Sequence, residues 1–234
     1  NICDELESLI KDQGIVFFRF DDDLFALNPK YIISFCEEFL RRGLERKLGW
    51  TCFGHVNCNN EEMVKIMARA NCFKIDFGVE SGSPELLKMM KKNISLETAK
   101  QTFDLCRKYQ IRSWANFMLG FPHETKAQVE ESIAAAVYTN PDYIQVSYVI
   151  PIPGTALYSE GIRNGHIDAD LPFDKYDSTG QIINTGDITE KELKELYNKF
   201  WKKFYLRPKV IWRELRWACT SRRELKRLMR GAWS

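Results

Sequence analysis

The sequence predicts an α/β fold built on a parallel β-sheet, with a helix after nearly every strand. Along residues 15–150, short apolar runs of strand length alternate with amphipathic helical patterns. Capping residues precede several helical patterns, and turns rich in glycine, proline or aspartate follow the strands. This alternation is typical of βα units with right-handed crossovers, which bring the carboxyl ends of the strands to one edge of a sheet.

Five strands are expected, at residues 15–20, 48–56, 72–79, 111–119 and 143–150. Each run is dense in apolar and aromatic residues and is bounded by polar or turn-forming residues. Five parallel strands cannot close an eight-stranded barrel, because strand number, tilt and shear must agree. The sheet is therefore either an open doubly wound sheet or part of an incomplete barrel.

Helices are expected where a capping residue precedes apolar residues at helical spacing. The chain opens inside such a pattern, at residues 2–11, so we expect a βα unit to precede Asn1. Asn28-Pro29 is a helix start, and Asn59 with Glu62 is expected to form a capping box. The further expected helices are 29–42, 60–70, a short one from 84, 95–109, 125–139, 189–207, one after Pro208 and one capped by Ser221 and Glu224.

Residues 154–186 are polar and are interrupted by glycine and proline, which predicts a loop with short turns. The helical pattern behind this stretch places Leu193, Leu196, Phe200 and Phe204 on one face. We expect residues 1–158 to form a partial barrel, and residues 159–234 to form a loop and helical extension packed on it.

Composition and charge describe an ordinary globular chain. Of its 234 residues 44% are hydrophobic, and the formal net charge is only +2, which offers no electrostatic argument for nucleic acid. Basic residues outnumber acidic ones between Lys191 and Arg230. This excess is interpreted either as a solvated helical face or as a surface for a phosphate-rich or acidic partner. No apolar run is long enough to span a membrane, and no signal peptide is visible.

The seven cysteines are scattered through apolar stretches and show no Cys-x-x-Cys spacing. This odd count suits reduced thiols in a cytoplasmic protein better than a disulfide framework. We therefore expect no zinc site and no metal ligands within the chain.

Candidate ligand-binding residues follow four of the strands. The run from Asp21 to Asp23 is either a solvated turn or a site for a cation or ammonium group. Glu80 stands in a glycine-rich turn, where a carboxylate accepts two hydrogen bonds from a diol such as ribose or else pairs with a neighbouring cation. His55 and Asn57 follow the second strand, although a lone histidine is more often structural.

The later junctions have simpler explanations. Gly120 and Pro122 suit a tight, stiff turn, Thr125 suits a cap, and Glu124 favours the helix N-terminus electrostatically. The stretch from Pro151 to Pro153 lacks two amide protons, which leaves carbonyl groups free to accept from an exocyclic amine such as that of adenine.

Taken together, these junctions resemble those of the radical S-adenosylmethionine (SAM) enzymes. The resemblance is strongest to the subgroup with an N-terminal cobalamin-binding domain, which is similar to the anaerobic magnesium-protoporphyrin ester cyclases. It covers roughly residues 1–230, and the order and spacing of the motifs are more specific than any one of them. The matching segments are Phe20-Asp21-Asp22-Asp23-Leu24-Phe25, Gly78-Val79-Glu80-Ser81-Gly82-Ser83, Gly120-Phe121-Pro122-His123-Glu124-Thr125, Pro151-Ile152-Pro153-Gly154-Thr155-Ala156-Leu157-Tyr158 and Phe204-Tyr205-Leu206-Arg207-Pro208.

The resemblance implies an incomplete parallel (β/α)6 barrel that lacks its first strand here, with S-adenosylmethionine across the strand ends. Asp21 and Asp22 would lie near the methionine amino end of the cofactor, and Glu80 would bind the ribose hydroxyls. His55 and Asn57 would face the substrate, and no catalytic residue is assigned. The other residues implied at the cofactor are Ser81 beside Glu80, Leu119 and Gly120 along the adenine, and Pro151 with Pro153 next to it.

One departure from the family pattern concerns the iron–sulfur cluster. The Cys-x3-Cys-x2-Cys motif that binds the [4Fe-4S] cluster of the family is absent from the chain. In the family that motif follows the first strand, so its ligands are expected upstream of Asn1, as is any cobalamin-binding domain.

The sequence therefore predicts the C-terminal part of a radical SAM enzyme. With an upstream cluster, it would generate a 5′-deoxyadenosyl radical or relay a methyl group through cobalamin, acting on a small-molecule substrate. An electron donor such as a flavodoxin or a ferredoxin is an implied partner. Two alternatives stay open: a tRNA-modifying radical enzyme that binds nucleic acid, and a non-catalytic binding domain derived from the barrel.

Overall fold

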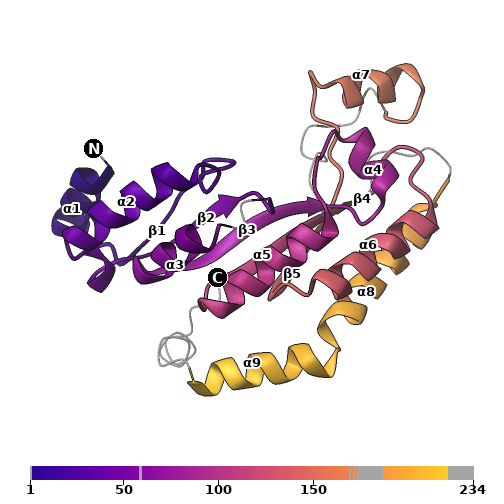
Figure 1. The fold of residues 1–234 in the computed structure, drawn as a ribbon. Coiled ribbons are helices and arrows are strands. Elements are labelled where there is room, and N and C mark those ends of the chain that lie inside the picture. The colour runs from indigo at the N-terminus through magenta and orange to yellow at the C-terminus, as the bar shows by residue number, and fades with distance from the viewer. Residues whose placement is uncertain (1, 58–59, 169, 171, 173–186, 221–234) are drawn as a thin grey trace.

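A computed structural model describes residues 2–57, 60–168, 170, 172 and 187–220, with side chains up to residue 217 (Figure 1). Its five strands form one sheet in which every neighbouring pair is parallel and the strand order follows the chain. A doubly wound sheet reverses its order at a switch point, and this sheet does not. The expected incomplete barrel is confirmed. The strands are β1 (Phe17–Arg19), β2 (Gly49–Gly54), β3 (Cys72–Glu80), β4 (Arg112–Leu119) and β5 (Tyr143–Tyr148).

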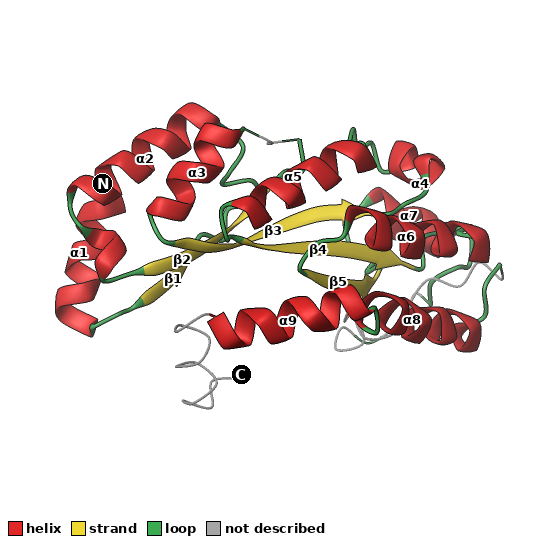
Figure 2. Ribbon diagram, turned by 60° about the horizontal axis from the view of Figure 1, so that its bottom comes forward, coloured by secondary structure: helices red, strands yellow, loops and turns green. Residues whose placement is uncertain are grey.

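Helices cover the sheet unequally. Figure 2 shows α2, α3 and α5 over one face of the sheet, and α9 on the opposite side. The helices are α1 (Ile2–Gln13), α2 (Pro29–Arg41), α3 (Glu61–Arg69), α4 (Pro84–Met89), α5 (Leu96–Lys108), α6 (Lys126–Thr139), α7 (Ala156–Arg163), α8 (Glu190–Tyr205) and α9 (Pro208–Thr220), with a short 3₁₀ helix η1 (Leu44–Arg46). No helix in the described ranges is long and apolar enough to cross a membrane.

The main core lies between the sheet and the helices of the covered face. Alternate residues of β3 and β4 point into it, so that Phe77 packs on Phe103 of α5 and Phe117 packs on Phe200 of α8, with ring centroids 5.4 and 5.2 Å apart. Leu193, Phe200 and Phe204 are all fully buried or nearly so in this core. Helix α8 thus packs on the sheet, while the expected division of the chain at residue 158 stays a prediction.

Local capping chemistry explains where most helices begin. The boxes of Thr125 with Gln128 and of Thr189 with Glu192 are both formed. The box expected from Asn59 is wrong, because α3 begins one residue later and Asn60 accepts a 2.8 Å hydrogen bond from the Met63 amide. Adjacent asparagines give equally good capping signals, and Asn59 itself lies outside the described residues.

The loop expected over residues 154–186 is wrong for its first part, which forms α7. Thr155 caps this helix by accepting from the Tyr158 amide at 3.2 Å. Gly161, which suggested a break, lies within this helix. Glycine suits the position because a Cβ added there would stand 2.2 Å from Cδ1 of Ile167. The remainder of that loop, and the helix expected from Ser221, lie outside the described residues except for a few positions.

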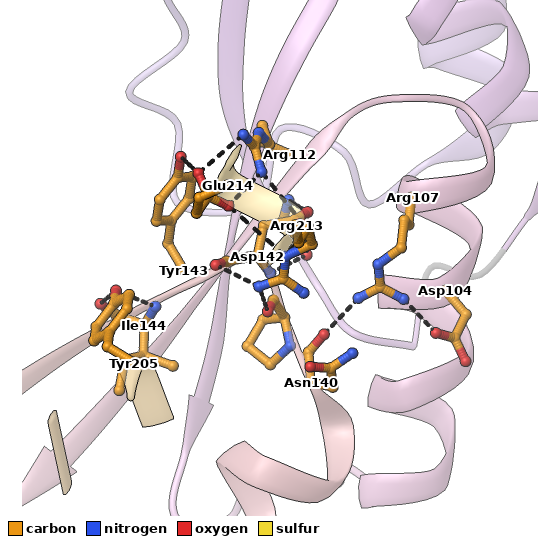
Figure 3. A network of polar contacts seen from close by, with 12 residues as sticks. Asp104, Arg107, Arg112, Asn140, Asp142, Tyr143, Ile144, Tyr205, Arg213 and Glu214 are labelled. Atoms are coloured by element: carbon orange, nitrogen blue, oxygen red, sulfur yellow. Dashed lines mark hydrogen bonds and ion pairs between the residues drawn. The ribbon is translucent and has the colours of Figure 1, made fainter. Parts of the chain in front are cut away.

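A network of polar contacts fastens α9 across the amino-terminal ends of β4 and β5 (Figure 3). Arg112 of β4 donates two hydrogen bonds to Glu214 of α9, at 2.8 and 3.1 Å, and Tyr143 of β5 donates a third at 2.8 Å. The Arg112 guanidinium also lies 3.9 Å from the centroid of the Trp217 ring. Arg213 donates to the carbonyl groups of Pro141 and Asp142. Helix α9 thus closes one end of the face that the other helices leave open.

Candidate functional site

The carboxyl ends of all five strands lie along one edge of the sheet, because every strand pair is parallel. Asp21, His55, Glu80, Gly120 and Pro151 each follow or end a different strand. In parallel α/β folds this edge is where ligands bind. The candidate site is therefore built from one short segment of each βα unit.

Glu80 has an unusual backbone that turns its side chain onto the open face of the sheet. The register of β3 against β4 shifts between Gly78 and Glu80, and Glu80 has a φ of 68°, which non-glycine residues adopt rarely. Its carboxylate folds back over Gly78: an added Cβ there would stand 2.3 Å from Oε1. Backbone strain of this kind is concentrated at functional sites.

Lys92 pairs with this carboxylate, and two polar residues that follow β2 lie close to the loop that carries Lys92. Lys92, in the loop after α4, donates to Glu80 Oε1 at 3.0 Å. Asn57, after β2, donates from its side chain to the carbonyl of Asn93 at 2.8 Å. The pKa of His55 is lowered, first by burial and second by the charge of Lys92. The structure thus brings both residues predicted to face the substrate to the vicinity of Glu80.

The tautomer of His55 follows from its hydrogen bond. Its Nδ1 accepts from the Asn57 amide at 3.1 Å, so in the neutral ring the proton is on Nε2. Because burial and Lys92 both favour the neutral ring, His55 presents an N–H donor rather than a cation to a ligand at this edge.

The turn after β4 is organised by a buried carboxylate. Gly120 has a φ of 87°, and its amide donates to Glu124 Oε2 at 2.6 Å, joined by the Phe121 amide at 3.3 Å. Glu124 is only 2% exposed, and burial raises its pKa to about 7 although the two amides act to lower it. Glu124 therefore braces the Gly120 turn from within, and its expected electrostatic effect on the helix N-terminus stays a prediction.

The remaining predicted cofactor residues differ in what they expose. Leu119 and Ser81 are both 0% exposed, so neither residue presents any surface to a ligand in this conformation. Pro151 is buried whereas Pro153 is exposed. Their assignment to a cofactor stays a prediction.

The acidic run stands apart from Glu80, since β2 lies between β1 and β3. Asp21 pairs with Arg19 at 2.7 Å, and both side chains are at least half exposed. Asp22 is exposed as well. Among the described residues, these two carboxylates make no contact with the Glu80 group, so they could meet it only through a ligand.

The open face of the sheet carries a polar and aromatic row that the sequence reading missed. In register across it stand Phe53, Asp76, Trp114 and Tyr143. Lys74 donates to Asp76 and lies 4.5 Å from the centroid of the Trp114 ring. Burial raises the pKa of Asp76, and Lys74 opposes this effect. The available signal was the period-two alternation of polar residues along β3 and β4.

The side chains at the carboxyl edge fit a nucleoside-type cofactor better than a metal cluster. Glu80 offers a carboxylate acceptor on the open face and Lys92 an ammonium group beside it. By contrast, within the described part of the chain no three His, Cys, Asp or Glu residues form a group that could hold a metal. Five cysteines are described there, and all are buried free thiols.

Comparison with known proteins identifies the relatives of this chain. The family model described as "Radical SAM superfamily" matches residues 3–136. The chain is 31% identical to "Uncharacterized methyltransferase PH0819" of Pyrococcus horikoshii, over 92% of this chain and 46% of that protein. It is 29% identical to the anaerobic magnesium-protoporphyrin IX monomethyl ester cyclase of Cereibacter sphaeroides, over 90% of this chain and 34% of that protein.

Among solved structures, the fold is similar to that of TsrM from Kitasatospora setae, a radical SAM methyltransferase solved with cobalamin and a [4Fe-4S] cluster bound. The TM-score is 0.62 at 23% identity, over 70% of this chain and 33% of that one. This similarity concerns the fold alone. The chain spans less than half the length of these two curated relatives.

Proposed function

The chain belongs to the radical SAM superfamily, and from this premise we propose that its strand edge binds S-adenosylmethionine for a reaction on a small-molecule substrate. The observation that carries the proposal is the geometry of Glu80. A strained backbone and a side-chain-free Gly78 together aim its carboxylate onto the open face, beside Lys92. A carboxylate in that position accepts two hydrogen bonds from vicinal ribose hydroxyls.

Each end of the cofactor then has a chemically suitable neighbour. The ammonium group of Lys92 suits the carboxylate of the methionine moiety, and Asp21 or Asp22 suits its amino group. The half-buried Gly120 would lie along the adenine, with the buried Leu119 behind it. The expectation that the carbonyl groups between Pro151 and Pro153 are free is wrong for Ile152, whose carbonyl accepts from the Thr155 amide at 3.1 Å and from the Thr155 hydroxyl at 2.7 Å. The Pro151 carbonyl would accept from the adenine amine.

Bound S-adenosylmethionine would supply a 5′-deoxyadenosyl radical or a methyl group, and the names of the two relatives, a methyltransferase and a cyclase, support both outcomes. The residues of this chain would orient the cofactor and exclude water. His55 would donate a hydrogen bond from Nε2 to the substrate, and Asn57 would hold the His55 ring through its amide. Within the described part of the chain, no group of three His, Cys, Asp or Glu residues could hold an iron–sulfur cluster.

The partners follow from the proposed chemistry. A reaction that begins from a reduced iron–sulfur cluster would require an electron donor such as a flavodoxin or a ferredoxin. Buried free thiols at Cys36, Cys52 and Cys72 suit a reducing compartment such as the cytoplasm.

Calorimetric titration of the chain with S-adenosylmethionine tests the proposal. Glu80→Ala should weaken binding at least tenfold, because it removes an acceptor of two charge-assisted hydrogen bonds. Glu62→Ala, at an exposed position of α3, is the control and should bind like the wild type. Equal affinity of the wild type and Glu80→Ala would contradict the assignment of Glu80.

A further inference from the structure

The turn that follows Glu80 is tied to α6 by a continuous chain of hydrogen bonds. The Ser83 amide donates to Ser81 Oγ at 3.1 Å, and Ser81 Oγ lies 3.1 Å from Ser132 Oγ. Ser132 in turn donates to the carbonyl of Gln128 at 3.1 Å and accepts from the Gly82 amide at 2.9 Å. Because the Ser132 proton is used for Gln128, the proton between the two hydroxyls comes from Ser81.

The three serines of this hydrogen-bond chain are buried. Ser81 and Ser132 are 0% exposed and Ser83 is 2% exposed. Loss of the Ser132 hydroxyl would leave the buried Gly82 amide and the proton of the Ser81 hydroxyl without an acceptor, although Ser81 Oγ would still accept from the Ser83 amide. An unsatisfied buried donor costs more than an exposed hydrogen bond contributes. The turn would then relax to a conformation that recovers partners.

Steric contact restricts the turn from the same side. A Cβ added at Gly82 would stand 2.3 Å from the carbonyl oxygen of Glu131 and 2.7 Å from Cβ of Ala135, both on α6. The turn therefore lies against the helix backbone, two residues after the left-handed Glu80. A strained residue persists only where its surroundings hold it, and here the surroundings are α6.

From these contacts we propose that Ser132 is a positioning residue, which holds the Ser81–Gly82 turn so that the Glu80 carboxylate points at the cofactor ribose. The proposal rests on the function proposed above for Glu80. Ser132 touches no ligand itself and acts only through the backbone of the turn.

Thr139 provides a matched control on the same helix. Its hydroxyl is also 0% exposed and donates to the carbonyl four residues earlier, Ala135, at 2.8 Å. It differs from Ser132 in that this hydrogen bond stays within α6. Ser132→Ala and Thr139→Val therefore both remove a buried helix hydroxyl, but only the first removes the link to the turn.

The first experiment measures S-adenosylmethionine affinity in a double-mutant cycle with Glu80. Ser132→Ala should weaken binding about tenfold, and Thr139→Val should change it less than twofold. In the Glu80→Ala background, Ser132→Ala should cause no further loss, because its effect passes through that carboxylate. An equal loss in both backgrounds, or no loss in the wild type, would overturn the proposal.

The second experiment needs no ligand. Amide hydrogen exchange at Gly82 should be at least tenfold faster in Ser132→Ala than in the wild type, and unchanged in Thr139→Val. Unchanged exchange at Gly82 would overturn the positioning role. If the wild type fails to bind S-adenosylmethionine, or Glu80→Ala binds equally well, the proposed function fails, and this exchange rate still decides whether Ser132 holds the turn.

Discussion

The carboxylate of Glu80 occupies the space that a side chain at Gly78 would fill, since an added Cβ would lie 2.3 Å from Oε1 and 3.1 Å from Nζ of Lys92. Both of these atoms are at the ends of flexible side chains. The strand therefore tolerates a larger residue only by displacing the Glu80–Lys92 pair.

Gly78→Ala is accordingly expected to weaken S-adenosylmethionine binding while leaving the free energy of unfolding nearly unchanged. The carboxylate must move off the open face, so S-adenosylmethionine affinity should fall about tenfold. The free energy of unfolding should change by less than about 1 kcal/mol, because β-strand backbone accepts alanine and no backbone atom blocks it. Calorimetry and urea denaturation measure the two quantities, and unchanged affinity would contradict the described position of Glu80.

Lys92→Met should raise the pKa of His55. Lys92 is the second cause of the lowered His55 pKa, after burial, so its removal should return the pKa only part of the way to the ordinary value. A proton NMR titration of the His55 ring would show the change. Lys88→Met, at an exposed position of α4, should leave the titration unaltered.

Glu124→Gln should remove a pH dependence of stability. The wild-type carboxyl has a pKa of about 7 when folded, against an ordinary 4.5, so the folded state binds more protons between these values and loses stability as the pH rises. Relative to the wild type, the variant should gain about 2 kcal/mol in unfolding free energy between pH 5 and pH 8.

Urea denaturation at the two pH values provides that measurement, with Glu192→Gln as control. The pKa of Glu192 is lowered from an ordinary 4.5 to about 2 by its hydrogen bonds to Lys126 and Thr189. The stability that Glu192 contributes is therefore lost only as the pH falls from about 4.5 toward 2, below the range of this experiment. The difference between this control and the wild type should stay constant from pH 5 to pH 8. A constant difference for Glu124→Gln as well would contradict the raised pKa.

Glu214→Ala should weaken the packing of α9 on the sheet and leave the sheet folded. It removes the shared acceptor of Arg112 and Tyr143, and the Arg112 side chain is only 8% exposed, so about 1–3 kcal/mol of unfolding free energy should be lost. Hydrogen exchange should accelerate in α9 and not in β3. Glu130→Ala, which breaks the exposed pair with Lys199, should cost under about 1 kcal/mol.

The strand ends could be predicted because each has a local signature. Glu80 stands between glycines after an apolar run, and Gly120 precedes a proline and a cap. Their partners have no such signature: Ser132 is an ordinary small residue on the inner side of a helix, and it meets Gly82 only when α6 docks. Glu214 reaches Arg112 across 102 positions of the chain. Contacts that depend on docking leave no periodic trace in the sequence.

The helix α7 illustrates the same limit on a smaller scale. A glycine within a polar stretch is usually a breaker, and Gly161 was interpreted in that way. Its absent side chain instead makes room for Ile167, six residues further on. Only the packed structure distinguishes a glycine chosen for backbone freedom from one chosen for close approach.

The strand order has a consequence for how the chain acquires its site. Since each strand pairs with the one before it, the sheet can grow from β1 to β5 in the direction of synthesis, with every new pairing closing a loop of similar, modest length. The Glu80 turn forms early in this sequence, but its tether, α6, arrives only after β4. A ligand that requires Glu80 to be held in place would therefore bind only chains in which α6 has already docked against the Glu80 turn.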